Sequence, residues 1–190
     1  LRLCYTVSAM PLSQKIERLV QEGGWIRHMF EAGISLKLQH GEDQVFDLSL
    51  GNPVVEPPPA FHAELKRLAN RPNKGMHRYM PNAGYPETRQ AVADGLYRET
   101  GIRFTLDEIV MTCGAAATLN VVLKAILNPG DQVVFPSPFF VEYGYYVDNH
   151  GGEPVPAPTD ASFLPDISLL DEAITSRTRA LLINSPNNPT

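Results

Sequence analysis

The second half of the chain alternates between short apolar, β-branched runs and longer segments with helical periodicity. The short runs predict buried strands at Ile109–Thr112, Gln132–Phe135, Glu153–Pro156 and Arg179–Ile183. The intervening segments predict helices at Thr118–Leu127, Val141–Asn149 and Ile167–Ser176, the last with Asp166 as its N-cap. Strands that alternate with helices across short joins favour an α/β fold, with a mostly parallel sheet and helices on both of its faces.

The first half of the chain predicts mainly helices bounded by Gly or Pro. Apolar positions at helical spacing indicate helices at Leu12–Gln21, Trp25–Gln39, Ala60–Ala69 and between Pro86 and Gly101. Gly23-Gly24 is expected to separate the first two of these helices, and Phe46–Leu50 is expected to form a short strand. Residues 70–85 show no periodicity and predict a long loop, which in a compact domain is usually functional.

Composition excludes several classes of protein. The chain has 190 residues, of which 43% are apolar and 19% charged, as is typical of globular proteins. A net charge of −5 argues against nucleic acid as the main partner, and no run of about 18 apolar residues predicts a membrane span. The two cysteines, Cys4 and Cys113, form neither a disulfide framework nor a metal pattern, so we expect a reduced, cytoplasmic setting. The five histidines show no metal-binding spacing.

The turn at Gly114 to Ala117, between the first predicted strand and the next helix, contains only small side chains. Free N–H groups and a partial positive charge at a helix start attract anions, and small residues leave those groups uncovered. The turn is therefore a candidate phosphate site. The alternative is a tight turn whose small residues serve only helix–strand packing, because neither a GxGxxG pattern nor a Walker lysine is present.

Three segments leave predicted strands at their carboxyl ends, where ligands bind in open α/β sheets: Cys113–Ala116, Pro136–Phe140 and Asn184–Thr190. The first offers backbone N–H groups for an anion. The second offers Phe140, whose flat face suits stacking on a ring. The third offers Asn188, a neutral donor and acceptor next to proline. A phosphate, an aromatic ring and a polar ring substituent together describe pyridoxal 5'-phosphate.

The segment Asn184–Thr190, NSPNNPT, resembles the NPxNPTG signature of the class I/II (fold-type-I) pyridoxal-phosphate-dependent aminotransferases, of the aspartate-aminotransferase type. Four further stretches agree with that family in the same order: SLGNP at 49–53, RYMPNAG at 78–84, NPGD at 128–131 and SPFF at 137–140. The similarity runs from about Pro11 to Thr190 and corresponds to the N-terminal half of a family member. No single one of these five stretches is specific to the family, but all five together, in the family's order, are specific to it.

The resemblance implies a role for each matching residue. Backbone N–H groups of Ala115 and Ala116 would bind the cofactor phosphate, Phe140 would stack on the pyridine ring, and Asn188 would bind its phenolic oxygen. Gly51 would approach the substrate carboxylate, and Tyr79 would reach the phosphate of the neighbouring subunit in a homodimer. The family further implies an N-terminal arm with part of the small domain at 11–58 and the first part of the cofactor-binding large domain at 59–190. Residues 1–10 differ from the rest and are expected to be a leader or expression remnant.

The implied reaction moves an amino group between an amino acid and a 2-oxo acid, and it needs a Schiff-base lysine. The chain has five lysines, Lys15, Lys37, Lys66, Lys74 and Lys124, and none follows Asn188, where the family places it. We therefore expect that lysine, the pyridine-nitrogen aspartate and the carboxylate-binding arginine beyond residue 190, and no activity from this stretch alone. A same-fold lyase or decarboxylase, a non-catalytic ligand-sensing protein and a plain nucleotide-binding domain remain alternatives.

Overall fold

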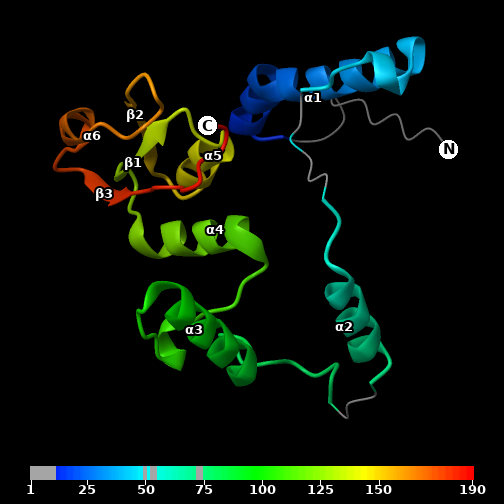
Figure 1. The fold of residues 1–190 in the computed structure, drawn as a ribbon. Coiled ribbons are helices and arrows are strands. Elements are labelled where there is room, and N and C mark those ends of the chain that lie inside the picture. The colour runs from blue at the N-terminus through cyan, green and yellow to red at the C-terminus, as the bar shows by residue number, and fades with distance from the viewer. Residues whose placement is uncertain (1–11, 49–50, 52–54, 72–74) are drawn as a thin grey trace. The chain divides into compact units, whose positions relative to one another are not determined.

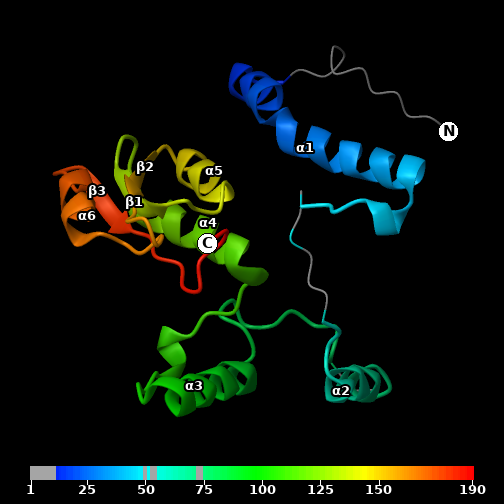
Figure 2. The ribbon, with the colours of Figure 1, turned by 45° about the horizontal axis from the view of Figure 1, so that its top comes forward.

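The computed structural model describes residues 12–48, 51, 55–71 and 75–190 (Figures 1 and 2). The chain divides into two compact units, Leu1–Met76 and His77–Thr190. The predicted leader at 1–10 lies outside the described residues. The predicted domain boundary between residues 58 and 59 refers to the small and large domains of the family, and it stays a prediction.

The first unit contains the helices α1 (Gln14–His40) and α2 (Pro59–Ala69) and the short 3-10 helix η2 (Glu42–Gln44). Ser13 caps α1 by accepting a hydrogen bond from the N–H of Ile16 at 3.3 Å. The expected break at Gly23-Gly24 is wrong, because α1 is continuous through both glycines. A glycine in a helix interior costs only about 1 kcal/mol relative to alanine, which a 27-residue helix tolerates.

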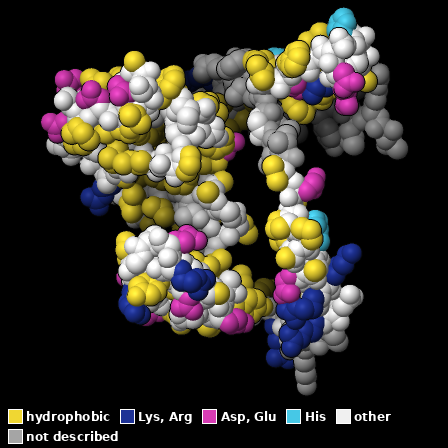
Figure 3. Space-filling view, in the orientation of Figure 1, with side chains coloured by type: hydrophobic (Ala, Val, Ile, Leu, Met, Phe, Trp, Pro, Cys, Tyr) yellow, Lys and Arg dark blue, Asp and Glu magenta, His cyan; other side chains and the backbone are white. Residues whose placement is uncertain are grey.

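Apolar side chains of the first unit are largely exposed. Among the described residues of α1 and α2, the exposed ones include Val20, Phe30, Leu38 and Phe61, and Figure 3 shows yellow side chains at the surface of both helices. The strand expected at Phe46–Leu50 does not appear over residues 46–48, where Phe46 and Leu48 are more than 90% exposed, and residues 49–50 are not described. The helix predicted at Ala60–Ala69 is confirmed by α2.

The second unit begins with an exposed loop and the helix α3 (Pro86–Thr100). Gly101 ends α3 in the left-handed conformation, with φ 74°. This confirms the helix that the sequence predicts between Pro86 and Gly101. The 3-10 helix η3 (Leu106–Glu108) follows and is closed by a capping box between Thr105 and Glu108. The strand predicted at Ile109–Thr112 is wrong: the N–H of Met111 donates to the carbonyl of Ala83 at 2.9 Å instead of joining the sheet.

The sheet has three parallel strands in the order β2-β1-β3, with β1 at Gln132–Ser137, β2 at Glu153–Pro158 and β3 at Thr178–Leu181. The joining helices are α4 (Gly114–Ile126), α5 (Glu142–Asp148) and α6 (Ile167–Ala173). Alternate residues of β1 point to opposite faces, so the central strand serves two cores. The predicted α/β class, a parallel sheet with helices on both faces, is confirmed.

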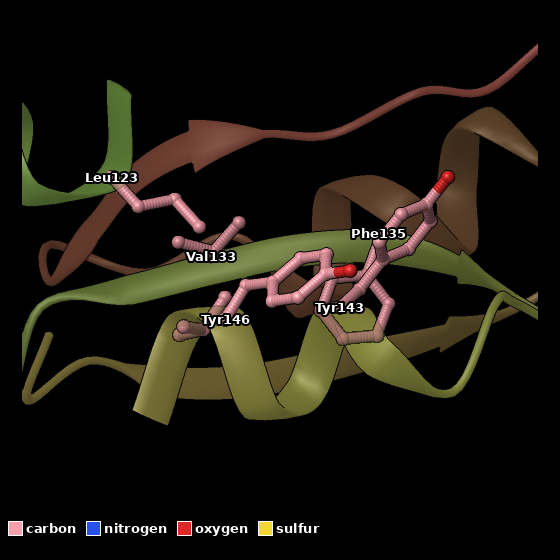
Figure 4. Close-up of a cluster of buried hydrophobic side chains, with 6 residues drawn as sticks. Leu123, Val133, Phe135, Tyr143 and Tyr146 are labelled. Carbon is pink, nitrogen blue, oxygen red and sulfur yellow. The ribbon is translucent and has the colours of Figure 1, made fainter. Parts of the chain in front are cut away.

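The larger core lies between β1 and the helices α4 and α5 (Figure 4). It is built from Val133 and Phe135 of β1 with Leu123, Tyr143, Tyr146 and Val147 of the two helices. On the opposite face, Val134 packs with Ala157 of β2 and Leu170 of α6. Val133, Val134 and Phe135 are completely buried, so β1 is the most enclosed element of the unit. No helix in the described part of the chain is long and apolar enough to cross a membrane.

Candidate functional site

The first turn of α4 contains the predicted phosphate site. Gly114 has φ 81°, a conformation that favours glycine, and a Cβ built there would meet no atom within 4 Å. Cys113, the N-cap residue, makes no side-chain capping hydrogen bond, and Ala115 and Ala116 are exposed. The first N–H groups of this 13-residue helix are therefore left without a side-chain cap, and open space adjoins them. Such a turn can bind an anion through its backbone and the helix dipole.

The direction of α4 relative to the sheet points its first turn toward the carboxyl edge of the strands. Near the other end of α4, the Nε of Arg179, in β3, donates to the carbonyl of Ile126 at 3.2 Å. The helix thus runs antiparallel to the strands, and its last turn lies beside the start of β3 (Figures 1 and 2). The predicted phosphate turn is on the side where β1 and β3 end.

Phe140 lies in the loop between β1 and α5 and is half-buried. Its ring meets Tyr143 edge to face, with centroids 5.6 Å apart and an interplanar angle of 83°. The neighbouring Phe139 packs on Phe135 of the core at a centroid distance of 4.5 Å. Both phenylalanines are thus fixed from the core side, which restricts the positions that the Phe140 ring can adopt.

Asn188 is exposed, whereas its neighbour Asn187 is held by the protein. The Nδ2 of Asn187 donates to the carbonyl of Pro138 at 3.0 Å and to the Oγ1 of Thr190 at 2.7 Å. From the other side, the Oγ1 of Thr159 donates to the carbonyl of Ser137 at 2.7 Å. The exits of all three strands are therefore linked by hydrogen bonds, and the segments that carry Phe140 and Asn188 are brought together.

The hydrogen bonds of Asn187 and Thr159, which join the strand exits, were not predicted from the sequence. The NSPNNPT motif contains Asn187, but the pattern does not tell which of its asparagines faces the protein and which faces solvent. Thr159 follows β2 without any motif, so its bond to the loop after β1 becomes evident only when the strands are paired.

A small hollow lies beneath these loops. It has a volume of about 50 Å³ and is lined by residues that include Phe139, Tyr143, Leu182, Asn184 and Asn187. Ligand pockets usually have about 300–1,000 Å³, so this hollow has room for ordered water and not for a phosphorylated ring. A larger ligand would lie over the exposed loops instead.

Two further predicted residues, Gly51 and Tyr79, are exposed. Gly51 belongs to the first unit, is exposed, and has no atom within 4 Å of an added Cβ. Tyr79 lies on the loop before α3 and is fully exposed. The roles of Gly51 and Tyr79 stay predictions, as does the joint contact of Ala115, Ala116, Phe140 and Asn188 with one ligand.

Carboxylates with shifted pKa values lie at the opposite edge of the sheet. The backbone N–H of Asn128 lowers the pKa of Asp131, and hydrogen bonds from Gln132 and Arg177 lower the pKa of Glu153. These residues stabilise the turn before β1 and the start of β2. Within the residues that the structure describes, no cluster of three or more His, Cys, Asp or Glu could hold a metal ion. The carboxyl edge instead offers amides, a carboxamide and aromatic rings.

Known proteins share this sequence and fold. The model of the family "Aminotransferase class I and II" matches residues 43–190. A probable aspartate/prephenate aminotransferase of Thermus aquaticus is 38% identical over 158 residues, 82% of this chain and 40% of that protein. An aspartate aminotransferase of Pyrococcus horikoshii is 33% identical over 87% of this chain and 40% of its own length. The chain thus spans about two fifths of the curated relatives that it matches.

Solved structures agree. A crystal structure of an aminotransferase from Eubacterium rectale superposes with a TM-score of 0.88 and 33% identity, covering 95% of this chain and 46% of that one. The aspartate aminotransferase of Thermus thermophilus with maleate gives a TM-score of 0.75 and 33% identity over 95% of this chain and 46% of the other. The match of one family model to more than half of the residues, together with these relatives, shows that the chain belongs to the class I and II aminotransferases.

Proposed function

We propose that this chain forms part of a pyridoxal-phosphate-dependent aminotransferase, which transfers an amino group between an amino acid and a 2-oxo acid. The observation that carries the proposal is the uncapped, alanine-lined start of α4 in a chain of the aminotransferase family. The hydrogen-bonded strand exits support the same assignment. Relatives named for aspartate make aspartate the first amino donor to test.

The residues present fit this cofactor by the chemistry of their donors. Amide N–H groups of Ala115 and Ala116 suit a phosphate dianion, because they add no competing charge and no side chain covers them. Phe140 would bind a face of the pyridine ring, and Asn188 would donate to its phenolic oxygen. When bound, the pyridine ring supplies an electron sink for negative charge at the substrate α-carbon. The protein's contribution is to bind and orient that ring.

The remaining assignments extend the proposal to the assembled enzyme. The backbone of Gly51 would approach the substrate carboxylate, where the absence of a Cβ gives room. Tyr79, exposed on its loop, would reach the cofactor phosphate of the neighbouring subunit in a homodimer. The exposed free thiol of Cys113 is compatible with a reduced, cytoplasmic setting.

We expect no transaminase turnover from the 190-residue chain alone, because none of its five lysines occupies the position after Asn188 at which the family places the Schiff-base lysine. The test incubates the chain with pyridoxal phosphate, aspartate and 2-oxoglutarate and follows glutamate formation. Glutamate formation above that of the same mixture without the chain contradicts this expectation.

Cofactor binding is tested separately from turnover, by titrating pyridoxal phosphate and following its fluorescence. We expect the chain to bind pyridoxal phosphate more tightly than pyridoxal, because only the former has a phosphate for the start of α4. Phe140→Ala and Asn188→Ala should each weaken binding of both compounds by about tenfold, the effect of losing one good contact. Equal affinity for the two compounds contradicts the proposed phosphate site.

A further inference from the structure

Gly84, at the end of the RYMPNAG loop, is in close contact with the segment that leads to the phosphate turn. Its φ is 98°, and an added Cβ would lie 2.7 Å from the Cγ and 2.8 Å from the Cβ of Met111. Real Cβ atoms essentially never approach other heavy atoms below 3.0 Å, so any side chain at position 84 would displace Met111. The same loop binds Met111 by a second contact, since the Met111 N–H donates to the carbonyl of Ala83 at 2.9 Å.

The next residue connects Met111 to the first turn of α4. The Oγ1 of Thr112 lies 2.5 Å from the Oγ1 of Thr118 and donates to the carbonyl of Gly114 at 3.2 Å. The Oγ1 of Thr118 also lies 3.2 Å from the carbonyl oxygen of Gly114. Because the two hydroxyls have two hydrogens, only two of these three contacts are hydrogen bonds at one time. The position of the turn is therefore set by hydrogen bonds on both sides of the Thr112 hydroxyl, and Thr112 follows directly on the residue that Gly84 contacts.

The segment before Met111 is also held in place, by α3. Arg89 of α3 has an almost buried side chain, its Nη2 donates to the carbonyl of Leu106, and the same group lies 3.8 Å from Asp107. Residues 106–112 are thus bound to α3 at one end and to the loop at 83–84 at the other. These contacts replace the sheet pairing that the sequence predicts for Ile109–Thr112.

We infer that Gly84 is a positioning residue for the phosphate-binding turn: its contact with Met111 sets, through Thr112, where the N–H groups of Ala115 and Ala116 point. The inference rests on the proposed function, because it assigns the anion of the cofactor to that turn. Displacing Met111 shifts Thr112 and loosens the first turn of α4. Gly84 itself touches no ligand in this assignment.

The decisive comparison is between Gly84→Ala and Gly101→Ala. Both glycines have positive φ, 98° and 74°, so both substitutions introduce the same kind of backbone strain. Only at Gly84 does the new Cβ meet another residue, since nothing lies within 4 Å of a Cβ at Gly101. A second matched pair is Thr112→Val, which removes the hydroxyl bonds to the α4 turn, and Thr100→Val, which removes a hydroxyl bonded to Leu96 at the end of α3.

The experiment has two measurements on the 190-residue chain. The first records ¹H–¹⁵N spectra of Ala115 and Ala116 without ligand. The second is the affinity for pyridoxal phosphate divided by the affinity for pyridoxal, which isolates the phosphate contribution. For Gly84→Ala and Thr112→Val we expect shifted Ala115 and Ala116 signals and a ratio reduced at least about tenfold, the effect of losing one hydrogen bond to a charged group. Gly101→Ala and Thr100→Val should retain the wild-type signals and ratio.

The outcomes separate this inference from the proposed function. If the wild-type chain does not prefer pyridoxal phosphate, the phosphate site is refuted, and the amide signals still decide whether Gly84 positions the turn. If Gly84→Ala and Gly101→Ala change the Ala115 and Ala116 amides equally, strain alone explains the effect and the inference is overturned. If Gly84→Ala does not fold, Thr112→Val decides: wild-type amide signals and ratio in that variant overturn the inference.

Discussion

At the residue scale, two adjacent carboxamides after β3 have different environments. Asn187 is half-buried and donates to Pro138 and Thr190, whereas Asn188 is exposed. The first therefore joins the loop after β1 to the loop after β3, and the second is available to a ligand. The two adjacent asparagines of the motif therefore differ in what they contact.

Asn187→Ala should lower the free energy of unfolding by about 1 kcal/mol, because it removes hydrogen bonds to Pro138 and Thr190. Asn188→Ala is the matched control and should change it by less than about 0.5 kcal/mol, as exposed substitutions usually do. Urea unfolding followed by circular dichroism measures both variants. Equal destabilisation by the two substitutions would contradict the assignment of Asn187 as the structural residue.

Tyr146 is the one residue of the core whose pKa is strongly shifted among the described groups. Its hydroxyl donates to Glu142, and this hydrogen bond, together with burial and the negative charge of Glu142, raises the pKa of Tyr146 to about 12. Because the folded-state pKa exceeds the value of 10.0 that an unperturbed tyrosine has, the stabilisation is fully present below pH 10 and is lost as the pH rises toward 12.

A tyrosinate absorbance titration should therefore show a late component that Tyr146→Phe removes. Glu142→Gln should move that component toward lower pH, because it removes the negative charge beside the hydroxyl. A titration in which Tyr146→Phe removes an early component would contradict the raised pKa.

At the element scale, helix ends with a chemical signal could be predicted and irregular segments could not. Asp166, Pro86 and Gly101 mark their helix ends by capping or restricted backbone geometry, and the structure places helix boundaries there. The helix break predicted at Gly23-Gly24 was wrong because the free-energy cost of a glycine inside a helix is small. The strand predicted at Ile109–Thr112 was wrong because β-branched residues suit any extended backbone, whether or not it joins a sheet. In this protein the N–H of Met111 donates to Ala83 on a loop.

The cap of α6 provides a test at this scale. The Oδ1 of Asp166 accepts hydrogen bonds from the N–H groups of Ser168 at 2.8 Å and Leu169 at 3.2 Å. Asp166→Ala should cost about 1 kcal/mol of stability, typical for the loss of an N-cap. Asp171→Ala, at an exposed position late in the same helix, removes the same charge and should cost less than about 0.5 kcal/mol. Thermal or urea unfolding distinguishes the two.

At the scale of the whole molecule, the apolar core is unequally distributed. The second unit buries Val133, Val134, Phe135 and Val147 completely, whereas no large apolar side chain of residues 12–20, 28–48, 55–71 and 75–76 in the first unit is buried. Local opening requires less free energy where few apolar contacts must be broken. The two units should therefore differ in local stability within one chain.

Hydrogen exchange followed by mass spectrometry should show this difference. Amides of α1 and α2 should exchange at least about tenfold faster than those of β1, since opening free energies range from near zero to the global value. Peptides from β2 and β3 serve as an internal comparison for the sheet. Equal protection of α1 and β1 would contradict an unequal core in the chain.

Candidate site residues could be proposed from the sequence where a motif specifies chemistry, and not where tertiary contacts specify position. The small residues at 114–117, Phe140 and Asn188 could be proposed because anion binding, ring stacking and hydrogen bonding each require a recognisable residue type. The contact of Gly84 with Met111 and the bond from Thr159 to Ser137 join residues more than 20 positions apart. A pattern of neighbouring residues in the sequence does not predict contacts between positions so far apart.

The double attachment of the loop after β1 has a consequence for protein engineering. Because Thr159 and Asn187 bind the backbone of Ser137 and Pro138 from both sides, we expect the backbone of the loop to be retained when the ring at position 140 is exchanged. Exchanging Phe140 for tyrosine or tryptophan would then change the proposed stacking surface alone. A library restricted to that one position would sample different ring electronics on a constant scaffold.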